Sequence, residues 1–206
     1  MTHLTRTLAA GIAFAGSIAA SAATPSFATF ADPSHTAATP LFTFDKGLNQ
    51  LSGSWTLPGL TLHQPLFSTT ASDVRFTMAP VSLTSGTVNL GTLGPGSFTF
   101  EEFDGSNWVQ VLRVAFTSAT LTQFQFAAGA GDGVEFFDSL DNPLSGWTDK
   151  SFAFSLTNRR DFVDSGRDLR TYTASFGSTA SPVPEPAAAG VLGVGALALM
   201  RRRRSR

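Results

Sequence analysis

Apolar and polar residues alternate through most of this sequence, and phenylalanine occupies many of the apolar positions. Four Phe-x-Phe triplets begin at Phe42, Phe98, Phe124 and Phe152. Because successive side chains of a strand point to opposite faces, each triplet predicts a strand with both rings on one face. No part of this region sustains an apolar period of 3.6 residues over three turns, so the pattern favours strands over helices.

Turn sequences rich in Gly, Pro, Asp and Asn separate the predicted strands. The clearest hairpin is predicted at 97–117, with its loop at 104–107. Eight to eleven short strands with frequent turns predict an all-β domain, specifically a two-sheet antiparallel sandwich of jelly-roll-like or immunoglobulin-like form. We expect most of the Phe rings in its core, because Phe carries no polar group.

The first 23 residues have the pattern of a secretory signal peptide. An apolar run at 8–20 follows Arg6 and ends at Ala20-Ser21-Ala22, which fits the small-residue pattern of a cleavage site. The run is shorter than the ~20 residues that a bilayer span needs. We therefore expect export through the secretion translocon and cleavage by signal peptidase.

The C-terminus combines three elements in a fixed order. Val183-Pro184-Glu185-Pro186 precedes a charge-free run at 187–200, which predicts a short transmembrane helix. As a helix this run would rise about 21 Å, against roughly 30 Å of hydrocarbon. The basic residues that follow would stay at the cytoplasmic face as a membrane stop. They are Arg201, Arg202, Arg203 and Arg204.

This order of elements resembles the PEP-CTERM sorting signal of Gram-negative bacteria that produce exopolysaccharide. The resemblance is limited to the C-terminal tail. It implies that an exosortase-type membrane enzyme cleaves near Pro184 to Pro186. It also implies transient anchoring in the inner membrane, followed by release to the cell surface or the extracellular matrix. An ordinary single-pass anchor with a proline-rich stalk is the alternative interpretation.

The remaining chain divides into a lead, a domain and a linker. Residues 24–40 are rich in Ala, Thr, Ser and Pro, and we expect a flexible lead or a weak first strand there. The β domain is placed at 41–176, and 177–182 is expected to link it to the sorting signal at 183–206.

The charge distribution argues against nucleic-acid binding. The net charge of the chain is -1, but between 24 and 186 eight basic residues face 15 acidic ones, a formal charge of -7. Phosphate contacts would need clustered Lys and Arg on the folded part. The chain has no cysteine, so thiolate chemistry and disulfides are excluded. His35 and His63 have no metal-binding spacing, and no nucleophile motif is present, so we expect neither an enzyme nor a tightly held cofactor.

Acidic residues offer the remaining candidate chemistry. Glu101, Glu102 and Asp104 lie at the predicted hairpin, and a paired-carboxylate glycan hydrolase is one alternative. Calcium coordinated by oxygen atoms in loops is another. Its candidate ligands are Asp132, Asp138 and Asp141. The simplest interpretation is that these acids cap turns and keep an exported protein soluble.

Three tryptophans are candidates for carbohydrate contact, because an exposed indole face can hold a sugar ring. Trp147, flanked by polar turn residues, is the first candidate, and Trp108 and Trp55 are the others. A half-buried core position is the alternative for each. The sequence therefore predicts an exported, non-enzymatic surface or matrix protein that contacts exopolysaccharide. The alternatives are a secreted glycan hydrolase and a passive adhesive or structural subunit.

Overall fold

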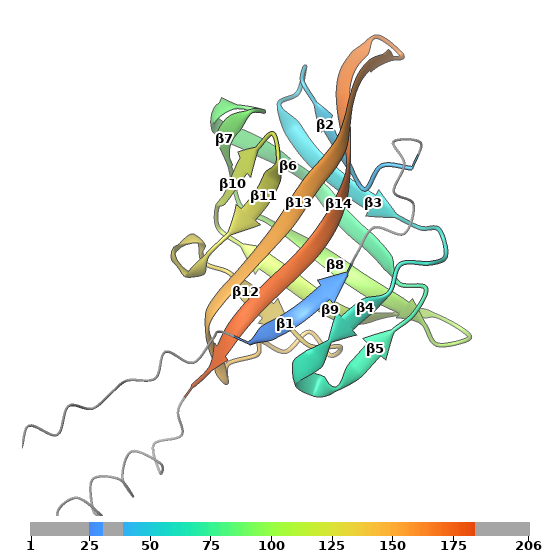
Figure 1. Cartoon of the computed structure of the whole chain (residues 1–206), viewed down its shortest axis with the longest axis vertical. Coiled ribbons are helices and arrows are strands. Elements are labelled where there is room, and N and C mark those ends of the chain that lie inside the picture. The colour runs from blue at the N-terminus through green and yellow to red at the C-terminus, as the bar shows by residue number, and fades with distance from the viewer. Residues whose placement is uncertain (1–24, 31–38, 184–206) are drawn as a thin grey trace, which may run out of the picture.

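The computed structural model describes residues 25–30 and 39–183, and nearly all of its regular structure is strand (Figure 1). Two 3₁₀ turns interrupt the strands, η1 (Pro65–Phe67) and η2 (Ala130–Asp132). The strands are β1 (Ser26–Phe30), β2 (Phe42–Asp45), β3 (Gln50–Trp55), β4 (Leu62–Gln64), β5 (Thr69–Ala71), β6 (Arg75–Thr87), β7 (Leu90–Leu93), β8 (Gly96–Phe103), β9 (Trp108–Phe116), β10 (Ala119–Thr122), β11 (Gln125–Ala128), β12 (Glu135–Phe137), β13 (Trp147–Asp164) and β14 (Arg167–Pro182).

The fold is a closed antiparallel barrel of eight strands, so the prediction of a two-sheet sandwich is wrong. Pairing runs from β6 through β7, β10, β11, β13, β14, β2 and β3, and β3 pairs with β6 again. The antiparallel, all-β character agrees with the alternation in the sequence. The closure differs, because the short strands β2 and β3 join the two ends of one sheet instead of belonging to a second sheet.

Strand length explains why the sheet can close. The strands β6, β13 and β14 have 13, 18 and 16 residues, and β6 and β14 each change neighbours along one edge. One edge of β6 pairs first with β8 and then with β7, while its other edge pairs with β3. Register shifts at Leu83/Ser85 and Thr157/Arg160 bend these strands. In β6 the alternation of buried and exposed side chains changes phase between Met78 and Val81, close to where the partner changes from β8 to β7.

Two wings extend from the barrel (Figure 1). One wing adds β8, β9 and β12 to β6, and the other adds β1, β4 and β5 to β14. Their inner faces contact each other through aromatic rings. The ring centroids of Phe27 in β1 and Phe136 in β12 lie 4.5 Å apart, and those of Phe30 and Phe100 lie 5.7 Å apart. The region between the wings continues the barrel core.

The predicted hairpin is confirmed. The strands β8 and β9 pair along their whole length, and the Asp104 amide donates to the Asn107 carbonyl in the loop between them. The aromatic core is also confirmed for three of the four triplets, in which both rings are buried. Phe124 departs from the prediction, with 69% of its surface exposed. It belongs to the β10–β11 turn, where its amide donates to Thr122 Oγ1, so the inward alternation starts only with β11.

The edges of the domain extend beyond 41–176. The predicted lead contains β1, whose Phe27 and Ala28 side chains are fully buried. The predicted linker at 177–182 is the last part of β14, where Ser178 and Ala180 are buried and Ser178 pairs with both β13 and β1. Only some of the side chains in these two segments are buried, so polar and small residues can occupy the remaining positions. The composition of these segments therefore resembles that of a linker.

The predicted signal peptide at 1–23, Pro184 to Pro186 and the run at 187–200 lie outside the described residues, as do Arg201, Arg202, Arg203 and Arg204. Across 25–30 and 39–183, no helix has the length and apolar character needed to span a bilayer.

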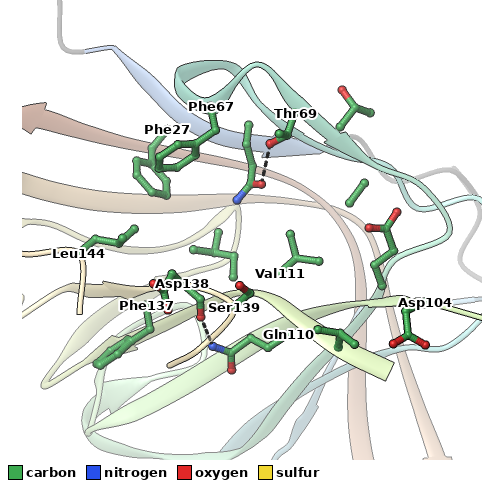
Figure 2. A pocket seen from close by; sticks show the side chains of 16 residues that line it. Phe27, Phe67, Thr69, Asp104, Gln110, Val111, Phe137, Asp138, Ser139 and Leu144 are labelled. Carbon is green, nitrogen blue, oxygen red and sulfur yellow. Dashed lines mark hydrogen bonds between the residues drawn. The ribbon is translucent and has the colours of Figure 1, made fainter. Parts of the chain in front are cut away.

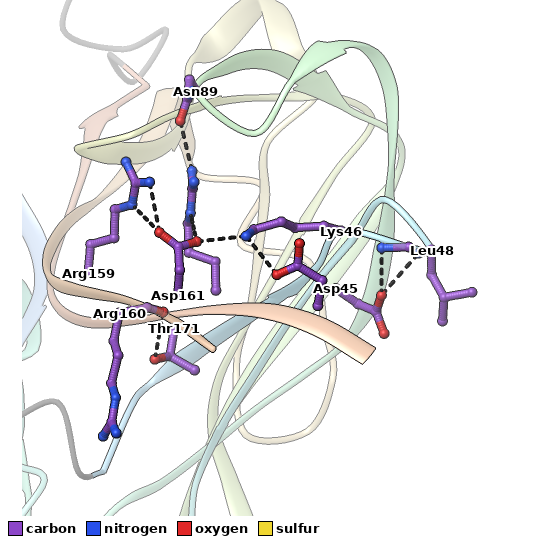
Figure 3. Close-up of polar contacts among 11 residues, drawn as sticks. Asp45, Lys46, Leu48, Asn89, Arg159, Arg160, Asp161 and Thr171 are labelled. Carbon is purple, nitrogen blue, oxygen red and sulfur yellow. Dashed lines mark hydrogen bonds and ion pairs between the residues drawn. The ribbon is translucent and has the colours of Figure 1, made fainter. Parts of the chain in front are cut away.

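A network of charged side chains, here called the barrel-end network, joins the β13–β14 hairpin to two neighbouring turns (Figure 3). Arg170 in β14 donates to Asp161 in β13 at 2.7 Å and to Asn89 in the β6–β7 turn at 2.8 Å. Lys46, in the β2–β3 turn, contacts Asp161 at 2.9 Å and Asp168 at 2.7 Å. These contacts fix three hairpins relative to one another at one end of the barrel.

Candidate binding cleft

A cleft of about 820 Å³ lies between the two wings (Figure 2). One wall is formed by β1, the β4–η1–β5 hairpin and the chain around it, and the other by the ends of β8, β9 and β12 with the loop that follows β12. Its size is within the range of small-molecule sites. The two wings therefore pack against each other over part of their inner faces and leave an open cavity between the rest.

The apolar part of the cleft is rich in aromatic rings. Phe67 in η1 and Phe27 in β1 meet edge to face, with ring centroids 5.4 Å apart, and the opposite wall presents Val111 and Leu144 (Figure 2). Phe27 is fully buried, whereas Phe67 is 44% exposed. The exposed ring of Phe67 follows from Pro65, which starts a short 3₁₀ turn, and from Ser68, whose positive φ ends it. An apolar side chain is thereby held at the mouth of the cleft.

Polar side chains of several types share the same cleft. Gln64 is only 8% exposed, and its Oε1 accepts a hydrogen bond from Thr69 Oγ1 at 3.1 Å. On the other wall, Gln110 donates from Nε2 to the carbonyl oxygen of Asp138. Glu102 accepts a hydrogen bond from the Ser72 amide at 3.2 Å. Amide, hydroxyl and carboxylate groups therefore surround an apolar floor.

Two carboxyl groups of the cleft have lowered pKa values because backbone amides hold their charged forms. Amide hydrogen bonds from Asn107 and Ser106 lower the pKa of Asp104. The pKa of Asp138 is lowered chiefly by the amide of Asn142, although burial acts in the opposite direction. Both groups are carboxylates at neutral pH.

The tryptophans are placed in three different environments. Trp55 is buried in the core and donates from Nε1 to the Leu57 carbonyl, so its ring offers no free face. Trp147 is half-buried behind the cleft wall, with its ring 6.4 Å from that of Phe67. Trp108 is 39% exposed at the tip of β9, where its ring lies 5.5 Å from that of Phe103. Of the three, Trp108 offers the most exposed ring.

The candidate calcium ligands are not brought together. Asp132 accepts hydrogen bonds from the Gly129 amide and Ser118 Oγ, which holds η2 against the preceding strand connection. Asp138 caps the turn that contains Asp141, and Asp141 contacts Arg113 at 2.6 Å. Among residues 25–30 and 39–183, no three His, Cys, Asp or Glu side chains form a group able to hold a metal ion. Asp132 and Asp138 accept hydrogen bonds from backbone amides of turns, as the simplest interpretation expects, whereas the Asp141 side chain contacts Arg113 and Gln110.

The acids of the predicted hairpin separate onto two sides. Glu101 pairs with Arg75 at 2.6 Å and does not line the cleft, whereas Glu102 and Asp104 do. Of the sorting motif, only Val183 is described, and its amide donates to the Gly146 carbonyl at 3.0 Å.

The sequence pattern does not mark the residues of the wall formed by β1 and the β4–η1–β5 hairpin, among them Gln64 and Phe67. The short strands β4 and β5 have three residues each, too few for alternation to mark them. The one available signal was Pro65-Leu66-Phe67, an apolar sequence at a position that turn chemistry would normally fill with polar residues.

Comparisons with known proteins add no relative. No protein-family model, no curated protein and no solved structure matches this chain.

Proposed function

We propose that this chain is an exported protein of the cell surface or extracellular matrix, sorted by an exosortase-type enzyme. In this proposal its barrel domain contacts exopolysaccharide in the cleft between the wings, without hydrolysing it. The destination is supported by the signal peptide pattern and by the resemblance of the C-terminal tail to PEP-CTERM signals. The ligand class is supported by the lining of the cleft.

That lining is the observation that carries the ligand class. A sugar ring presents an apolar face and a rim of hydroxyl groups, so its binding sites combine aromatic or apolar surfaces with amides and carboxylates. Phe67 supplies an exposed aromatic ring at the cleft mouth, and Gln64, Gln110 and Glu102 supply hydrogen-bonding groups. The open cleft gives access to a segment of a longer chain.

A secreted glycan hydrolase is the second candidate, because Glu102, Asp104 and Asp138 line one cleft. A hydrolase of this type needs a general acid whose pKa is raised by an apolar environment. The pKa values of Asp104 and Asp138 are shifted in the opposite direction by backbone amides. This electrostatic arrangement favours binding without catalysis.

Phe67→Ala is expected to weaken binding of exopolysaccharide fragments about tenfold, because it removes apolar contact area from the cleft mouth. Titration calorimetry on the exported protein measures this change, and the fluorescence of neighbouring Trp147 gives an independent signal. Phe124→Ala is the matched control, since Phe124 is exposed but does not line the cleft. Equal loss in both variants would contradict a site at the cleft, and release of new reducing ends would support the hydrolase.

Co-expression with an exosortase is expected to remove the C-terminal arginines. The mass of the mature protein should correspond to a chain that ends near Pro184 to Pro186. Expression without the enzyme provides the control, in which the mass should include the arginine tail. An intact tail in both strains would contradict sorting by an exosortase and would favour an ordinary membrane anchor.

A further inference from the structure

The cleft carries negative charge that no basic residue of its lining offsets. Among its 16 lining residues are Glu102, Asp104 and Asp138, and none of the 16 is Lys, Arg or His. Backbone amides contact all three carboxyl groups, but amides leave the net charge in place.

Three basic residues contact acids of the β8–β9–β12 wing or of the loop after β12, and one of them, Arg113, also lies over the ring of the lining residue Phe137. Arg75 pairs with Glu101, Arg113 with Asp141, and Lys150 with Glu135. None of these six residues lines the cleft. Of the described Lys and Arg, the other five lie at the barrel end or on the β13–β14 hairpin. They are Lys46, Arg159, Arg160, Arg167 and Arg170.

A buried amide in the same cleft provides a second, independent observation. The Gln64 side chain is more than nine-tenths buried, and its oxygen is occupied by Thr69. Its Nε2 has no hydrogen-bond partner within 25–30 and 39–183, although it belongs to a side chain that lines the cavity. This nitrogen is not among the fully buried, unpaired side-chain atoms, so it is open to the cleft and can donate to an acceptor oxygen of a ligand.

From these groups we infer that the cleft selects a polysaccharide whose sugar residues carry free, protonated amino groups. This inference rests on the proposed function and names the ligand class of the same site. The ammonium groups contact the carboxylates of Glu102, Asp104 and Asp138, a hydroxyl or carbonyl oxygen accepts from Gln64 Nε2, and an apolar sugar face packs on Phe67. A polysaccharide of uronic acids would bring like charges together, and a neutral one would leave the carboxylates without a counter-charge.

The test compares three oligosaccharides of equal length by titration calorimetry on the exported protein. They are a glucosamine oligomer, its fully N-acetylated form and a uronic acid oligomer. At low salt, we expect the glucosamine oligomer to bind at least about tenfold more tightly than the acetylated one, and the uronate not to bind. Raising the ionic strength to about 0.5 M should reduce this preference, because exposed charges are then screened.

Glu102→Gln should reduce the preference for free amino groups about threefold or more, since it removes one carboxylate that contacts only a backbone amide. Glu101→Gln is the matched control on the same strand, because Glu101 pairs with Arg75 outside the cleft, and it should leave the preference unchanged. Three outcomes would overturn the inference. The glucosamine oligomer could bind no more tightly than its acetylated form, the uronate could bind more tightly than the glucosamine oligomer, or the two variants could change the preference equally. If the neutral oligomer binds and Phe67→Ala weakens it, the proposed function stands without this specificity, whereas a failure of every oligosaccharide to bind contradicts both.

Discussion

Replacing Phe154 with alanine is expected to lower the free energy of unfolding by about 4 kcal/mol, because the substitution leaves a large cavity in the barrel core. The Phe154 side chain is fully buried in β13, and its ring contacts seven other rings. They are Phe30, Phe42, Phe76, Phe98, Phe126, Phe152 and Phe176. These rings come from strands on several sides of the barrel and from both wings, so none of them can move into the space without losing its own contacts.

Denaturant unfolding followed by circular dichroism measures this loss. Phe124→Ala is the control, because it also removes a phenyl ring but from a turn where most of the ring is in water. Its effect should stay within about 0.5 kcal/mol. A loss below about 1 kcal/mol for Phe154→Ala would show that the aromatic core is loosely packed and would contradict the arrangement of these rings.

Asp161→Asn is expected to lower the free energy of unfolding by about 2 kcal/mol at pH 7, the second largest effect. Arg170 is only 7% exposed, and the substitution removes the carboxylate that balances its charge. Removing one partner of a fully buried ion pair would lower the free energy of unfolding by more than this amount. Asp161 is about one-third exposed, however, so solvent screens part of the effect. Asp164→Asn is the control on the same hairpin, because Asp164 has no basic partner among the described contacts.

The same carboxyl group predicts a pH dependence. Burial raises the pKa of Asp161, but hydrogen bonds from Arg170, Lys46 and Arg159 outweigh it and hold the pKa well below its usual value. A lowered pKa in the folded state means that this stabilisation is present above the unfolded value of 3.8 and is lost as the pH falls below it. Unfolding measured from pH 7 to pH 2 should therefore show a smaller acid-induced loss for Asp161→Asn. Parallel curves for the two proteins would contradict this role.

Sequence patterning predicted individual strands well, because local alternation depends only on which face of a strand meets the core. The pairs Phe42 and Phe44, Phe98 and Phe100, and the β8–β9 hairpin all follow from it. The number of sheets did not follow, because it depends on where a long strand exchanges one neighbour for another. In β6 this exchange occurs between Met78, which pairs with β8, and Leu83, which pairs with β7.

The cleft could be anticipated only on one side. Glu102 and Asp104 were candidates because acids beside a hairpin loop are visible in the sequence, yet Glu101 in the same group points elsewhere and pairs with Arg75. The other wall, which contains Phe67, depends on β4 and β5. These two strands pair with each other and join the rest of the sheet through a single register pair, Thr29 in β1 with His63 in β4. Contacts between segments so distant in the chain leave no periodic pattern for sequence analysis to detect.

The last part of β14 changes the geometry of processing. Because Trp147 still pairs with Pro182 and the Val183 amide still contacts Gly146, the folded domain continues up to the first residue of the sorting motif. If cleavage occurs near Pro184 to Pro186, there is almost no slack chain between the folded domain and the protease. The processing enzyme would then have to bind close to the surface of the barrel. The released protein would end within a few residues of its last strand, without an extended C-terminal segment.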